Sequence, residues 1–347
     1  MPDIDPYDAV LVVSFGGPER PADVLPFLER VVRGKPVPRE RLLEVAEHYY
    51  LFGGKSPLND QNRALIRALQ AEFIEHGPKL PIYWGNRNWH PLLPDTLRQM
   101  TADGMRRALA LVTSAFSSYS SCRQYLENVA AARAEVGPSA PRVDKLRAFY
   151  NHPGFVGAMT ERVREALERL PAERRAAARL VYTAHSIPMT MAVNCRYEAQ
   201  LREACRLVSA ALDRTQWGLA YQSRSGRPSD PWLTPDLEDR LRELAAAGVR
   251  DVVVAPIGFV SDHLEVLYDL DTQAQRLCGE LGLQMVRAGT VGTHPLVIAM
   301  YRELILERMD SGGGLRVSGG GLRVDPYAQR RALGPLGPEP DICPTDC

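Results

Sequence analysis

One histidine stands directly after a predicted buried strand. Residues 180–184 (LVYTA) are apolar and rich in strand-forming side chains, and His185 follows them at the start of the turn HSIP. Neutral imidazole, with a pKa of about 6.5, can accept a proton or bind a metal near neutral pH. A core histidine that hydrogen bonds to a backbone carbonyl fits the same position equally well.

A second group of candidate residues is acidic. A strand is predicted to end near Ile257, and Glu265 and Asp269 follow it four residues apart, with Gln273 next in register on the same helical face. The spacing alone fits a solvated acidic face better than a site. Beside His185, however, such carboxylates suit ferrous iron, and an imidazole paired with a carboxylate can also remove protons and pass them on.

A duplicated α/β scaffold must hold these residues. Four segments recur in the same order in both halves: 9–18 matches 179–188, 82–91 matches 219–228, 104–118 matches 248–262, and 151–159 matches 293–300. Apolar strands alternate with helical stretches, which predicts parallel sheets with helices on both faces. Because ligands bind beyond the carboxyl ends of such strands, His185 lies where a site is expected.

Composition excludes several classes of protein. The 347 residues include 42 Lys plus Arg and 42 Asp plus Glu, so no net charge favours nucleic acid or an anionic membrane. No apolar run approaches the roughly 18 residues of a membrane helix. The N-terminus lacks the basic stretch and cleavage site of a secretory signal. We therefore expect a cytoplasmic protein with no transmembrane segment and no nucleic-acid partner.

The length favours about two domains. We predict an N-terminal lobe over residues 1–155, a C-terminal lobe over 156–309, a Gly-rich linker over 310–324 and a tail over 325–347. The linker contains a tandem copy of SGGGLRV, which is typical of a flexible exposed loop. A linker of this length would let the tail fold back onto the first lobe.

Several spaced motifs carry a resemblance to a known family: LVVSFGGPE at 11–19, GGKSPLN at 53–59, SSYSSCRQYLEN at 117–128, AHSIP at 184–188 and PIGFVSDHLEVLYDLD at 256–271. The chain resembles the ferrochelatases, lyase-class enzymes of heme biosynthesis that insert ferrous iron into a porphyrin, from about residue 8 to 308. It is most similar to the bacterial branch that converts coproporphyrin III into coproheme. The resemblance implies two similar Rossmann-like lobes that enclose a porphyrin cleft.

The resemblance also implies roles for the candidate residues. His185 would remove pyrrole protons or bind the iron, Glu265 would be its partner acid, and Asp269 would lie on the route of the incoming metal. In this family Ser56, Tyr125 and Arg33 correspond to positions that contact the propionates of the porphyrin, and hydroxyl and guanidinium donors suit carboxylates.

Two positions depart from the family pattern in the region that binds the porphyrin. Phe15 stands where some relatives have an iron-ligating tyrosine, so its ring can only pack against the macrocycle. His48 stands where some relatives have a second propionate-binding arginine, which would make that contact weaker or pH-dependent.

Three cysteines resemble part of an iron–sulfur site. Some members of the family bind a [2Fe-2S] cluster through one cysteine in the SSYSSC segment and three near the C-terminus, and Cys122, Cys343 and Cys347 match three of these four. Because such clusters generally need four ligands, the fourth is unidentified. Loose reduced thiols on a frayed tail are the alternative, and a bound cluster would be structural.

Other functions remain open at this stage. The substrate could be protoporphyrin IX, although we expect coproporphyrin III. A cobalt chelatase of the same fold would carry more histidines at its metal site than this sequence offers. A two-lobed binding protein without catalysis would share the duplication but would normally be exported. We expect a monomer that passes coproheme to a decarboxylase.

Overall fold

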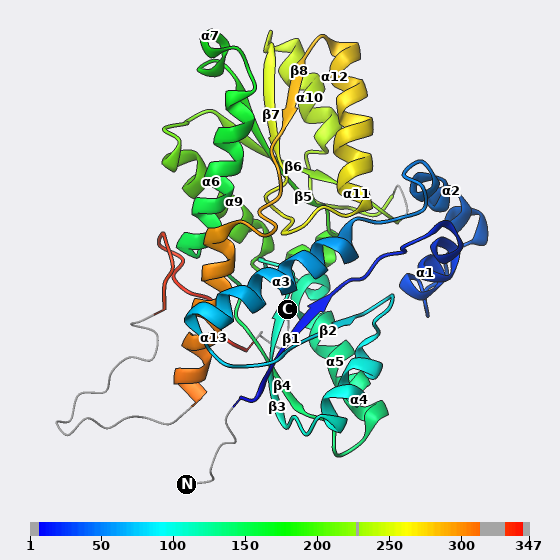
Figure 1. The fold of residues 1–347 in the computed structure, drawn as a ribbon. Coiled ribbons are helices and arrows are strands. Elements are labelled where there is room, and N and C mark those ends of the chain that lie inside the picture. The colour runs from blue at the N-terminus through cyan, green and yellow to red at the C-terminus, as the bar shows by residue number, and fades with distance from the viewer. Residues whose placement is uncertain (1–6, 227–228, 313–329, 343–347) are drawn as a thin grey trace, which may run out of the picture.

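Two four-stranded parallel sheets follow one another along the chain (Figure 1). The computed structural model describes residues 7–226, 229–312 and 330–342, and for 310–312 only the backbone. The first sheet has the order β2-β1-β3-β4 and the second the corresponding order β6-β5-β7-β8. The equal orders confirm the predicted duplicated α/β fold. The strands are β1 (Ala9–Ser14), β2 (Ile82–Asn86), β3 (Arg107–Val112), β4 (Arg142–Lys145), β5 (Arg179–His185), β6 (Trp217–Gln222), β7 (Asp251–Ala255) and β8 (Gln284–Arg287).

Helices connect the strands of each sheet. Around the first sheet lie η1 (Pro21–Asp23), α1 (Val24–Val31), α2 (Arg39–Tyr50), α3 (Leu58–His76), α4 (Leu93–Ala102), η2 (Tyr119–Arg123) and α5 (Gln124–Val136). Around the second lie α6 (Pro153–Glu168), α7 (Ala172–Arg175), α8 (Met189–Ala192), α9 (Tyr197–Ala211), α10 (Leu237–Ala246), α11 (Leu264–Val266), η3 (Leu267–Ala274), α12 (Gln275–Leu281) and α13 (Pro295–Gly312). η1 is a 3₁₀ turn, whereas η2 and η3 are π-helical.

Alternation along the strands divides the core. In β1, Val10 and Val12 point into one apolar cluster, whereas Ala9, Leu11 and Val13 point into another that contains residues of α4 and α5. The first cluster also contains Leu180 and Tyr182 of β5. One continuous core therefore joins the two sheets and fixes how their carboxyl ends face each other.

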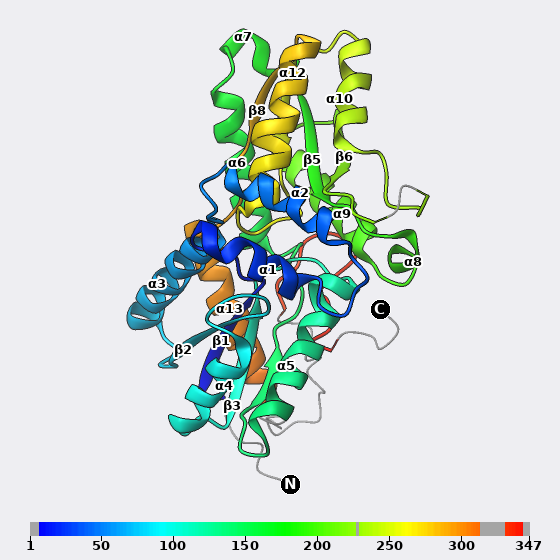
Figure 2. The same cartoon turned by 90° about the vertical axis from the view of Figure 1, so that its right-hand side faces the viewer.

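α1 and α2 form a separate unit beside these carboxyl ends (Figure 2). Their apolar faces enclose a small cluster that also contains Leu264, which follows β7 of the second sheet. Phe15 after β1 and Trp89 after β2 pack against the same cluster. The carboxyl ends of both sheets are thus brought together under α1 and α2, which we call the lid helices.

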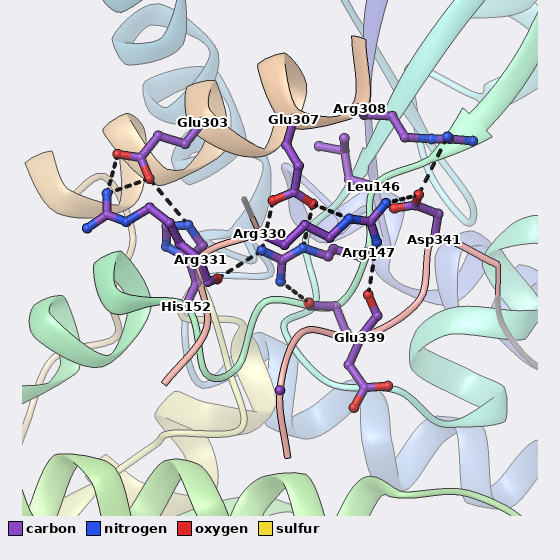
Figure 3. A network of polar contacts seen from close by, with 12 residues as sticks. Leu146, Arg147, His152, Glu303, Glu307, Arg308, Arg330, Arg331, Glu339 and Asp341 are labelled. Carbon is purple, nitrogen blue, oxygen red and sulfur yellow. Dashed lines mark hydrogen bonds and ion pairs between the residues drawn. The ribbon is translucent and has the colours of Figure 1, made fainter. Parts of the chain in front are cut away.

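The described part of the C-terminal tail, residues 330–342, is bound by a network of charges (Figure 3). Glu307 of α13 lies 2.7 Å from the Nε of Arg147, which follows β4, and 3.4 Å from the Nε of Arg330. Arg330 also forms an ion pair with Asp341, and Glu339 lies 3.1 Å from Arg196 beside α9. This segment therefore contacts residues that follow β4 in the first half of the chain and β5 in the second. The rest of the tail and most of the predicted linker lie outside the described residues.

Candidate active site

His185 is the last residue of β5, which lies between β6 and β7 in the second sheet. Its Nδ1 lies 2.5 Å from the carbonyl oxygen of Ser186. Because a carbonyl can only accept a hydrogen bond, Nδ1 carries the proton in neutral His185, and Nε2 keeps its lone pair. The backbone therefore orients the ring so that the basic nitrogen faces away from the strand.

Glu265 lies on α11, directly after the turn that follows β7. Its Oε2 is 3.7 Å from the Nε2 of His185, so the structure brings together the two residues that the sequence singled out first. The side chains are 36% and 52% exposed, respectively, which leaves room for a reactant to reach both. This arrangement can accept a proton at Nε2 and stabilise the resulting imidazolium by the adjacent carboxylate.

Asp269 is more enclosed than Glu265. It lies on η3 and accepts hydrogen bonds from the Nε2 of Gln222, at 3.1 Å, and from the hydroxyl of Ser223. Burial raises the pKa of Asp269 to about 6, and the nearby Glu265 adds to this effect. Asp269 therefore forms a buried carboxyl group beside the exposed pair, with its two hydrogen-bond donors located at the end of β6.

The helix that carries Asp269 is not a regular α-helix. η3 is a π-helix, in which hydrogen bonds join residues five apart. A π-helical turn holds more than four residues, so Asp269 and Gln273, which are four apart, remain on the same side of η3.

Sequence reasoning missed His263, which lies two residues before Glu265. Burial lowers the pKa of His263 and so favours the neutral ring. His185 also lowers this pKa, whereas Glu265 raises it, so both residues lie close to His263. Its ring contacts that of Phe259 edge-on, with centroids 5.0 Å apart. The motif DHLE at 262–265 could have revealed this residue, because it places a titratable histidine two positions before a candidate acid.

A guanidinium group that was also missed lies at the end of the first sheet. Arg87 follows β2 directly, and its guanidinium is 4.5 Å from the ring centroid of Tyr125 and 5.6 Å from that of Phe15. Its Nε donates to Asn128 of α5, at 2.6 Å. Tyr125 is buried, and burial raises its pKa while Arg87 opposes that change. The strand-end rule that located His185 applies equally to Arg87.

Three other residues that were predicted to bind the porphyrin differ in their exposure and contacts. Ser56 is 3% exposed, and its hydroxyl accepts a weak hydrogen bond from the backbone N–H of Leu58 at 3.4 Å. Arg33 lies on the exposed segment between the lid helices. His48 does not point freely into the site region: its ring is stacked on that of Tyr268, with centroids 3.8 Å apart.

The cysteines are widely distributed. Cys122 is buried in η2 and is disulfide-bonded in this structure, so it must be reduced before it can bind a metal. Cys343 and Cys347 lie outside the described residues. Burial raises the pKa of Cys278 to about 11 and that of Cys205 well above its usual range, so both are protonated thiols and poor metal ligands. Within the described ranges, no three His, Cys, Asp or Glu side chains gather as a metal-binding group.

Known proteins resemble this chain along its length. The sequence model of the ferrochelatase family matches residues 7–309. A ferrochelatase of Rhodopirellula baltica is 55% identical over 100% of this chain and 95% of its own length. A coproporphyrin III ferrochelatase of Streptomyces coelicolor is 51% identical over 100% and 95%, and one of Frankia alni is 51% identical over 98% and 86%. The chain belongs to the ferrochelatase family.

A solved structure shares the architecture. SirB from Bacillus subtilis, crystallised with Fe³⁺, aligns with a TM-score of 0.55 at 11% identity and covers 89% of this chain and 96% of its own. At this identity the likeness concerns the fold alone, and it supports the duplicated arrangement of two parallel sheets. Among the described helices, none is sufficiently long and apolar to cross a membrane.

Proposed function

We propose that the protein is a ferrochelatase that inserts ferrous iron into coproporphyrin III and releases Fe-coproporphyrin III. The close approach of His185 and Glu265 supports this proposal most directly, because metal insertion must remove two pyrrole protons near the arriving iron. Relatives named coproporphyrin III ferrochelatase at about half identity support the choice of porphyrin.

In the mechanism that we propose, the Nε2 of His185 accepts each pyrrole proton and Glu265 passes it to solvent. The porphyrin loses two protons and its four nitrogens bind one Fe²⁺, so the net charge of the porphyrin, including its propionates, is unchanged. Backbone bonding at Nδ1 favours this role, because it leaves Nε2 unprotonated before the reaction. The half-exposed Glu265 can exchange its proton with water.

Groups on the first sheet and the lid helices would hold the porphyrin. Phe15 offers a ring that can only pack against the macrocycle, and Arg87 and Arg33 offer guanidinium groups that suit propionates. Tyr125 would act together with Arg87, which lies over its ring. Ser56 is buried, so we propose that its hydroxyl contributes less to propionate binding than the two arginines do.

We also propose that Asp269 lies on the route by which iron approaches Glu265. Its carboxyl group has a raised pKa, so near neutral pH it can carry charge or a proton according to its surroundings. A route of this kind needs ligands that bind the metal weakly enough to release it. A carboxyl group held by the donors Gln222 and Ser223 meets that requirement.

Cys122, Cys343 and Cys347 form the proposed partial ligand set of a structural [2Fe-2S] cluster. Iron and acid-labile sulfide should co-purify with the full chain and be lost in Cys122→Ser. They should be retained in Cys195→Ser, which changes a free, partly buried cysteine that follows α8. Absence of both elements from anaerobically purified protein would remove the cluster from the proposal.

We propose two lobes over residues 1–155 and 156–309, a monomeric state, a cytoplasmic location and transfer of the product to a coproheme decarboxylase. The balanced charge of the chain offers no electrostatic reason for binding to an anionic membrane.

Anaerobic insertion of ferrous iron by the purified protein tests the function. Coproporphyrin III and protoporphyrin IX are supplied in parallel, and absorbance follows the conversion of free to metallated porphyrin. Turnover of coproporphyrin at the higher kcat/KM supports the proposal. Preference for protoporphyrin would transfer the same chemistry to the other substrate, and absence of turnover with both would contradict the enzyme assignment.

A further inference from the structure

Glu265 lies in the second half of the chain, but residues on either side of it contact elements of the first half. Its neighbour Leu264 is 2% exposed and lies in the apolar cluster of the lid helices. The other members of that cluster are Val24, Phe27, Leu28, Ala46 and Tyr49. The backbone that carries Glu265 is therefore anchored to the lid helices through the side chain directly before it.

A second contact lies on the other side of Glu265. The imidazole of His48, on α2, stacks on the phenol ring of Tyr268, on η3, with centroids 3.8 Å apart and ring planes 14° from parallel. Burial is the main cause that lowers the pKa of His48, and Arg41 acts in the same direction, against Glu265 and Glu44. A neutral ring stacks on phenol without leaving a buried charge unpaired.

A third contact holds the start of the segment. The side-chain oxygen of Gln61, on α3, accepts a hydrogen bond from the backbone N–H of Asp262 at 2.9 Å. Residues 262, 264 and 268 are thus each held by an element of the first half, whereas Glu265 is 52% exposed. Among the described residues, its one ion pair is the contact with His185.

We propose that His48 and Tyr268 are positioning residues that hold Glu265 against His185 by tying the lid helix α2 to η3. This inference rests on the proposed function and deepens it. Arg33, which would bind a propionate, lies on the segment between the lid helices, so porphyrin binding there and assembly of the acid–base pair become linked events. His48 then acts through Tyr268 and not as a ligand of the substrate, although its sequence position suggested a propionate contact.

The stack can be removed and restored by substitution. His48→Ala and Tyr268→Ala each delete one ring, whereas His48→Phe and Tyr268→Phe keep a ring in place. For the alanine variants we expect kcat to fall about tenfold or more with KM nearly unchanged, because small misplacement of a catalytic group is costly. The phenylalanine variants should remain near wild type. The double alanine variant should be no worse than either single variant, since one stack is lost in all three.

Hydrogen exchange across residues 262–270 provides a readout that needs no turnover. Faster exchange in His48→Ala than in His48→Phe supports the tie even if the wild type inserts no iron, an outcome that would defeat only the proposed function. A raised KM with unchanged kcat in both His48 variants would instead make His48 a substrate ligand and overturn the inference. Unchanged exchange and unchanged kinetics in the alanine variants would overturn it as well.

Discussion

The Nε2 of His185 and the Oε2 of Glu265 lie 3.7 Å apart, although His185 ends β5 and Glu265 comes after β7. β5 and β7 are neighbours in that sheet, so their carboxyl ends present both side chains to the same region. The sheet fixes the histidine, while the lid helices hold the segment of the glutamate. Both residues of the pair thus come from the second half of the chain, and elements of the first half contact the segment that carries Glu265.

Replacement of His185 by Ala should reduce iron insertion by about a thousandfold or more, because general-base catalysis typically contributes factors of this size. Porphyrin binding, measured by quenching of porphyrin fluorescence, should change little, since the proposed propionate contacts lie elsewhere. A variant that turns over normally would exclude His185 from the proton transfer.

Glu265→Gln keeps the shape of the side chain but removes its charge. We expect kcat to fall about a hundredfold, because the neutral amide can neither stabilise a protonated His185 by charge nor take up its proton. Initial rates of insertion provide the measurement, and an unchanged rate would show that the carboxylate plays no part.

Arg87→Ala tests the guanidinium that sequence reasoning missed. Loss of a charge-assisted contact to a propionate should raise KM about tenfold while kcat changes less, which corresponds to roughly 1.4 kcal/mol of binding. Arg87→Lys should recover only part of this affinity, because an ammonium group cannot make two parallel hydrogen bonds or stack on Tyr125 in the same way. Arg63→Ala, which removes a cation over Trp84 outside the candidate site, serves as the matched control. Equal KM values for all four proteins would contradict a propionate contact.

The duplication, the parallel sheets and the positions of His185 and Glu265 could be predicted from the sequence, because strand periodicity and strand ends are local signals. The stack of His48 on Tyr268 could not, since it depends on where α2 lies in space. Nor could the π-helical form of η3, because an apolar pattern with Leu270 and Ala274 buried fits an α-helix as well. Distant packing, which leaves no local pattern, thus explains why the stack was missed, whereas His263 and Arg87 did carry local signals.

Glu307→Gln tests the network that binds the C-terminal segment. Arg147 is 1% and Arg330 3% exposed. Removal of the carboxylate between them takes away the acidic partner of Arg147, whereas Arg330 keeps its ion pair with Asp341. We expect the free energy of unfolding to fall by about 3 kcal/mol, a typical cost of breaking one side of a buried pair. Urea unfolding measures the change.

The matched control for that substitution is Glu198→Gln, which removes an exposed ion pair with Arg202 on α9. Exposed pairs of this kind contribute less than about 1 kcal/mol, so the unfolding midpoint should hardly move. Equal effects of the two substitutions would show that the buried network contributes no more to stability than a surface pair.

Lys145, at the end of β4, gives a prediction in the opposite direction. It is 8% exposed, and its ammonium group donates to the carbonyl of Leu146 at 2.7 Å. Burial lowers its pKa from 10.5 to about 8, although Asp341 and Glu339 oppose the change. At pH 7 the folded protein therefore carries an unfavourable buried charge, and a shift of this size corresponds to about 3 kcal/mol.

Lys145→Met removes that cost, so we expect it to stabilise the protein by about 1–3 kcal/mol at pH 7. Between pH 8 and 10.5 the unfolded lysine keeps its proton while the folded one loses it, so wild-type stability rises with pH across this window. The advantage of Lys145→Met should accordingly shrink across the same window, whereas Lys79→Met at an exposed position should show no such trend. Urea midpoints measured from pH 7 to 10.5 provide the comparison. A variant less stable than wild type at pH 7 would mean that Asp341 and Glu339 outweigh the cost of burial, and that the lysine is an essential cation of the network.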